Sequence, residues 1–119
     1  MHTYKDLMQM QDEPVVAIDD RGLFFYANKS FELAYGWSEQ DLLGKMVTTI
    51  MPPHMRDAHN IGLSRFLTTE KSTLMYKPLD LPVTCKDGTT LSALHFIVGE
   101  KIDGKWKFAA RISLNKNEE

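Results

Sequence analysis

The chain has 119 residues, of which 43% are hydrophobic and 25% are charged, values typical of a single globular domain with its own core. Its formal net charge of −2 disfavours broad electrostatic binding to nucleic acid or to an anionic membrane surface. The single cysteine excludes an internal disulfide, and no apolar run reaches the roughly 20 residues of a membrane helix, so we expect a cytoplasmic domain without direct membrane insertion.

The first part of the chain predicts a short helix followed by a β-hairpin. Good helix formers over 3–11 predict the helix, and Pro14 ends it. Two short runs rich in β-branched and aromatic residues, 14–19 and 23–27, predict strands. The turn residues at 20–22 lie between them and indicate that the two strands pair as a hairpin.

Capping residues divide the next part of the chain into helices. Asn28 is placed to cap a helix that Gly36 ends. Ser38 and Asp41 have the spacing of a capping box, which predicts the start of a second short helix. A longer helix is predicted over about 53–68, because a proline at its first position costs little.

The last part of the chain predicts three strands joined by two hairpin turns. The strands are expected at 73–84, 89–99 and 105–114. An Asp-Gly pair in each connection, at 85–88 and 101–104, is typical of a tight turn.

This order predicts an α+β fold, with a five-stranded antiparallel sheet, helices packed on one face and a separate N-terminal helix. The first hairpin must pair with the last three strands, because a hairpin alone is not stable. We assign residues 1–12 to an N-terminal helix and linker, 13–114 to the folded domain, and 115–119 to a polar tail.

Three motifs in this order resemble the PAS family. The run 14–31 is similar to the family's opening pattern of a strand, D-x-x-G, a second strand and x-N-x-x-F. Residues 35–45 resemble its G-Y-S-x-E-E-L-L-G-K element, and Lys86-Asp87-Gly88 matches its closing hairpin. The resemblance implies a PAS-fold sensor of a bacterial-type signal transduction protein, such as a two-component system. Such a sensor is not itself an enzyme and relays a small-ligand, gas or redox signal to an attached output domain.

Within that family the helix at 51–66 resembles the haem-binding oxygen sensors of rhizobial histidine kinases. It matches the pattern M-P-x-x-x-R-x-x-H-x-x-x-x-x-R-[YF] without a gap. In those sensors the histidine that corresponds to His59 is the axial ligand of the haem iron, and Arg65 matches an arginine near the haem carboxylates. The resemblance therefore implies b-type haem as a cofactor.

Helical geometry places His59 at the centre of an apolar stripe. At 100° per residue, Met55, Gly62, Leu63 and Phe66 all lie within about 60° of it. Glycine in the interior of a helix lowers its stability by up to about 1 kcal/mol. A planar ligand lying against this face would explain why a glycine is present at position 62. The alternative is a core histidine bonded to a backbone carbonyl.

The side of the pocket opposite His59 departs from the oxygen-sensor pattern. Gap-free counting from His59 puts Leu79 where those sensors have an arginine that hydrogen-bonds bound oxygen, and Leu74 at an apolar position. Such a pocket would favour carbon monoxide or nitric oxide relative to oxygen. A small register shift would instead bring Tyr76 or Lys77 to the site.

Other candidate residues carry weaker signals. Strand alternation leaves His95 either in a pocket or outside, and we favour solvent or a partner surface. Cys85 lies beside a hairpin turn, where a covalent flavin bond is disfavoured. Trp37 could stack on a flavin, so non-covalent flavin binding remains an alternative. The sequence carries no nucleophile elbow, phosphate-binding glycine loop or H-E-x-x-H motif, so we expect no catalytic activity.

A second function remains open, in which the domain binds no cofactor and serves as an interaction module. A homodimer would then form through the N-terminal helix and the outer sheet face, with contacts from Leu7, Met8 and Met10. Unchanged dimerisation in light scattering after removal of residues 1–12 would contradict that role. Binding of another small metabolite is a third possibility.

Overall fold

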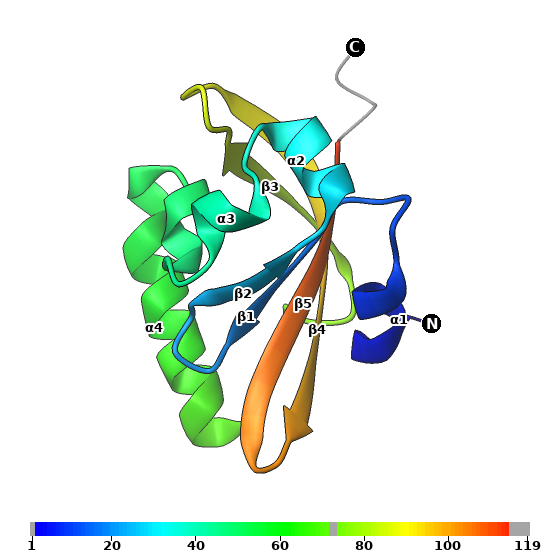
Figure 1. Cartoon of the computed structure of the whole chain (residues 1–119). Helices are drawn as coiled ribbons and strands as arrows, with labels where there is room; N and C mark the ends of the chain where they lie inside the picture. Colours follow the sequence, from blue (N-terminus) through cyan, green and yellow to red (C-terminus); the bar gives the residue numbers. More distant parts are fainter. Residues whose placement is uncertain (1, 72–73, 115–119) are drawn as a thin grey trace.

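The computed structural model describes residues 2–71 and 74–114 (Figure 1). The helices are α1 (Tyr4–Gln9), α2 (Lys29–Tyr35), α3 (Glu39–Leu42) and α4 (Pro53–Thr69), with a 3-10 turn, η1 (Val47–Ile50), before α4. The strands are β1 (Val15–Asp19), β2 (Phe24–Ala27), β3 (Pro78–Thr84), β4 (Thr90–Ile102) and β5 (Lys105–Leu114). The predicted polar tail and Thr73 lie outside the described residues.

The strands form one five-stranded antiparallel sheet in the order β2-β1-β5-β4-β3. The first hairpin joins the sheet through β1, where Val16 pairs with Ala110 and Ala17 pairs with Ala109 of β5. This arrangement confirms that the first hairpin pairs with the last three strands.

Both faces of the sheet are covered. Helices α2, α3 and α4 lie on one side of it, called here the inner face, and α1 lies on the other (Figure 1). Alternation along β1 divides its side chains accordingly: Val16 and Ile18 belong to the larger inner core, whereas Val15 and Ala17 pack with α1. The predicted fold class is confirmed.

The short helix α1 covers the outer face of its own sheet. Thr3 and Asp6 form a capping box at its start. Leu7 is fully buried in a cluster that includes Val15 and Val98. The Leu7 side chain therefore packs within its own chain. The homodimer stays a prediction.

The predicted caps are present. The Asn28 side chain accepts a hydrogen bond from the Phe31 N–H at 3.0 Å, and Gly36 ends α2 in the left-handed conformation with φ 86°. Ser38 and Asp41 form the capping box of α3. These ends depend on local chemistry, which explains why the sequence predicts them.

The predicted start of the strand at 73–84 is wrong, because residues 74–77 form a turn and β3 begins at Pro78. Tyr76 has a φ of 64°, in the left-handed region. Its N–H donates to the Ile97 carbonyl at 2.9 Å, and its hydroxyl donates to the Gly99 carbonyl at 3.0 Å. These bonds hold the turn against β4. Strand β4 is longer than predicted and runs to Ile102.

Within residues 2–71 and 74–114, no helix has both the length and the apolar character needed to cross a bilayer.

Candidate functional site

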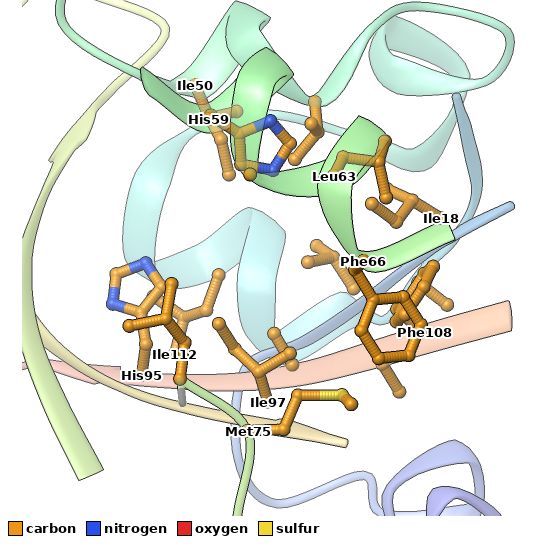
Figure 2. Close-up of a pocket in the computed structure, with 17 residues that line it drawn as sticks. Ile18, Ile50, His59, Leu63, Phe66, Met75, His95, Ile97, Phe108 and Ile112 are labelled. Carbon is orange, nitrogen blue, oxygen red and sulfur yellow. The ribbon is translucent and has the colours of Figure 1, made fainter. Parts of the chain in front are cut away.

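A cavity of about 190 Å³ lies between α4, η1 and the inner face of the sheet. Its walls come from β1, η1, α4, the turn before β3, β4 and β5. Among the described residues that line it, only His59 and His95 have polar side chains. Figure 2 shows His59 on the helix side of this space and His95 on the sheet side. The site is therefore an apolar chamber with two imidazoles.

His59 projects from α4 into the cavity and is half-buried. Its Nδ1 atom is buried and has no hydrogen-bond partner within the described part of the chain. Burial lowers the pKa of His59, and the side chain of Asn60 acts in the opposite direction. The ring is thus held towards its neutral form, the form in which imidazole binds a metal ion. A buried polar atom without a partner also points to a missing water or ligand.

The same face of α4 is open beside His59. Gly62 is exposed and borders the cavity, and a Cβ atom built on it would meet no atom within 4 Å apart from its chain neighbours and the nearby helix backbone. One turn further on, Phe66 packs edge-on against Trp106 and Phe108, with ring centroids 4.9 and 5.4 Å apart. Phe66 is the only buried residue of α4. The C-terminal half of the helix is therefore anchored to β5.

His95 faces the cavity, so the expectation that it faces solvent or a partner is wrong. It pairs with Ile112 of β5 and with Leu79 of β3, and Ile112 is a buried residue of the inner core. Directly paired residues lie on the same face of a sheet. The neighbouring residues Leu94 and Phe96 consequently point to the outer face.

The environment of His95 determines which of its two ring nitrogens carries the hydrogen. Nδ1 lies 3.1 Å from the Ala93 carbonyl oxygen, which can only accept, so Nδ1 carries the proton. Burial lowers the pKa of His95, while the Ala93 bond and the charge of Asp80 act in the opposite direction. In the neutral ring, Nε2 then has a free lone pair.

The structure brings together five of the predicted site residues: His59, Gly62, Leu63, Phe66 and Leu74 all line the cavity.

Three predicted residues are not among the described lining residues. Met55 is half-buried on α4, Arg65 is exposed on the same helix, and Leu79 lies on the inner face of β3 opposite His95. Their contact with a ligand remains a prediction.

Several lining residues were not singled out from the sequence. They are aliphatic or aromatic side chains of the sheet and of the turn before α4, including Val47, Ile50, Ile97, Phe108 and Ile112. Inward alternation along β4 and β5 and the apolar segment before Pro52 are the signals that could have identified them.

Cys85 does not line this cavity. It is buried elsewhere in the inner core, beside a separate surface hollow bordered by Tyr35 and Gly36. The described residues include no cluster of three or more His, Cys, Asp or Glu side chains suited to a metal ion. Any iron held here would therefore need a cofactor such as a porphyrin to supply most of its ligands.

Comparison with known proteins gives consistent results. Residues 3–95 match the sequence model of the family described as the PAS fold. The sensor protein FixL of Bradyrhizobium diazoefficiens is 29% identical over 104 residues, covering 87% of this chain and 19% of that protein. The chain therefore spans less than a fifth of that relative's length.

Two solved structures illustrate the shared fold. The PAS domain of a Desulfitobacterium hafniense protein has a TM-score of 0.70 at 21% identity, covering 91% of this chain and 97% of that one. The dark structure of the blue-light photoreceptor Aureochrome1 LOV has a TM-score of 0.71 at 19% identity, covering 99% of this chain and 86% of that one.

Proposed function

Because the chain belongs to the PAS family, we propose that it is a sensory domain that binds b-type haem through His59 and relays the haem's ligand state to an output domain elsewhere in its parent protein. The family match covers most of the chain, and a curated relative is a sensor protein. The proposed parent is a bacterial-type signalling protein of the two-component kind. Catalysis, if any, would belong to the output domain.

The observation that carries this proposal is the unpartnered Nδ1 of His59 in an apolar cavity. Burying a polar atom without a partner costs about 1–3 kcal/mol. A histidine kept only for packing would normally bond to a carbonyl, as His95 does to Ala93. Iron ligation through one ring nitrogen of His59 would give the buried imidazole a function. Haem bound here would supply an iron centre that takes up diatomic gases.

Haem loading requires α4 to move away from the sheet. The cavity of about 190 Å³ is smaller than the roughly 300–1,000 Å³ of most ligand sites. Movement of the helix is inexpensive at its N-terminal half, because Phe66 is its only buried residue and lies near the C-terminal end. The open space beside Gly62 is where the flat face of a porphyrin would pass the helix.

Strand β1 offers a route from the cavity to α1. Val16 and Ile18 line the cavity, whereas Val15 packs in the cluster that holds Leu7 of α1. A ligand that shifts Val16 and Ile18 would therefore change the packing of α1 on the other face. Such a ligand acts by favouring one of two arrangements of the domain.

Haemin titration of the purified domain tests the proposal. We expect a Soret band of the bound pigment at one haem per chain in the wild type. His59→Ala should remove or shift it. His54→Ala is the matched control, because His54 is exposed on the same helix and does not line the cavity.

No Soret shift in the wild type, or the same band in His59→Ala, would overturn the proposal. A parallel titration with flavin mononucleotide tests the flavin alternative, which would appear as a structured flavin absorption band that co-elutes with the protein.

A further inference from the structure

The cavity has a second imidazole that the haem proposal leaves without a role. His95 comes from β4, on the sheet side, and His59 comes from α4, on the helix side (Figure 2). The remaining described lining is aliphatic, aromatic, glycine or methionine. A group placed between α4 and the sheet therefore meets one nitrogen heterocycle on each side and hydrocarbon around its edge.

The hydrogen bond of His95 decides what its ring can do. Nδ1 donates to the Ala93 carbonyl, at 3.1 Å, which leaves Nε2 of the neutral ring without a hydrogen. In this tautomer Nε2 cannot donate to a bound gas molecule. It is an electron-pair donor, and a backbone carbonyl on the opposite nitrogen is the usual arrangement that orients a histidine ligand.

We infer that Nε2 of His95 is the second axial ligand of the haem that His59 holds, so that the resting iron is six-coordinate with two histidines. This inference rests on the proposed function. The Nε2 lone pair forms one coordination bond to the iron, and no proton or electron is transferred. Through this bond and the bond from His59, the cofactor would connect β4 of the sheet directly to α4.

The assignment changes how a gas would be sensed. With His95 on the iron, a diatomic ligand would have to displace it before binding, and binding would then break the link between β4 and α4. Apart from the two histidines, the described lining residues offer no side-chain hydrogen-bond donor in its place, and neither does Leu79, the cross-strand neighbour of His95. Oxygen depends more than carbon monoxide on such a donor, so the released site would favour carbon monoxide.

Spin state tests the inference independently of any output activity. The haem-loaded wild type should be six-coordinate and low-spin by absorption and resonance Raman spectroscopy. His95→Leu should keep its Soret band and one haem per chain but become five-coordinate and high-spin. His95→Gln provides a second variant of similar size, and added imidazole should restore the low-spin spectrum in both. His54→Ala should match the wild type.

Carbon monoxide binding gives a second readout. In the wild type the observed rate should level off at high gas concentration, because release of His95 limits it. In His95→Leu the rate should be at least tenfold higher and rise linearly.

A high-spin wild type, or a low-spin spectrum that persists in both His95 variants, would overturn the inference and leave haem binding through His59 intact. A wild type that takes up no haem would overturn the proposed function and this inference with it.

Discussion

Gly62 lies within α4 and is exposed, at a point where an added methyl group would meet no other part of the protein, so Gly62→Ala tests whether this side of the helix is open. An ideal Cβ at this position has no neighbouring atom within 4 Å. The substitution should therefore give the full helix-propensity gain of about 0.8–1 kcal/mol in unfolding free energy. For a domain of this size, that gain corresponds to about 4 °C in Tm.

Gly99→Ala is the matched control, with the opposite sign. A Cβ at Gly99 would lie 3.0 Å from Cδ1 of Phe108 and 3.1 Å from Sδ of Met75. Crowding of this kind costs about 1–3 kcal/mol, so this variant should be less stable than the wild type by about 1 kcal/mol. Thermal unfolding followed by circular dichroism, together with urea titration, measures both changes.

A third glycine variant connects this position with ligand binding. Gly62→Phe should fill the space beside His59 and weaken haemin binding at least tenfold, while leaving the helix formed. If Gly62→Ala lowered the free energy of unfolding, the space beside the helix would not be open and the haem path along it would be refuted.

Two further predictions concern stability. Asn28→Ala should lower the unfolding free energy by about 4 kcal/mol, at about 1 kcal/mol per hydrogen bond. Its buried side chain accepts from the Val15 and Phe31 N–H groups and donates to the Met10 and Glu13 carbonyls at 2.8–3.0 Å. Urea unfolding measures this, with exposed Lys29→Ala as control; a loss under about 1 kcal/mol would contradict the four-bond account. Hydrogen bonds from Lys86 and from the Ser38 backbone lower the pKa of Asp41 from 3.8 to about 2, so its stabilising effect is complete above the unfolded pKa and is lost as the pH falls towards about 2. Asp41→Asn should lose less stability than the wild type across this window in acid titrations of unfolding, and equal losses in both would show that the charge of Asp41 does not stabilise the fold.

Local chemistry in the sequence predicts much of this fold. Asn28, Gly36 and the Ser38–Asp41 capping box define helix ends through contacts within a few residues, and the structure has each of them. The helical stripe around His59 is also local, because its members are one turn apart. The family resemblance then connects these elements to the PAS fold.

The start of β3 could not be predicted this way. Residues 74–77 read as strand in the sequence, but Tyr76 is held in a turn by bonds to Ile97 and Gly99 of β4. Those partners lie more than twenty residues away along the chain. Only the folded sheet brings them together.

The face of the sheet on which the His95 side chain lies also depends on the tertiary structure. Strand alternation reveals the core when one face of a sheet is apolar and the other polar. In β4 both sets are largely apolar, Ala93 and Ile97 on one face and Phe96 and Val98 on the other, because α4 covers the inner face and α1 contacts the outer one. The sequence by itself determined the sensor family, the helix ends and the inward direction of His59. The pairing of β4 with β3 and β5 decided that a second histidine shares its cavity.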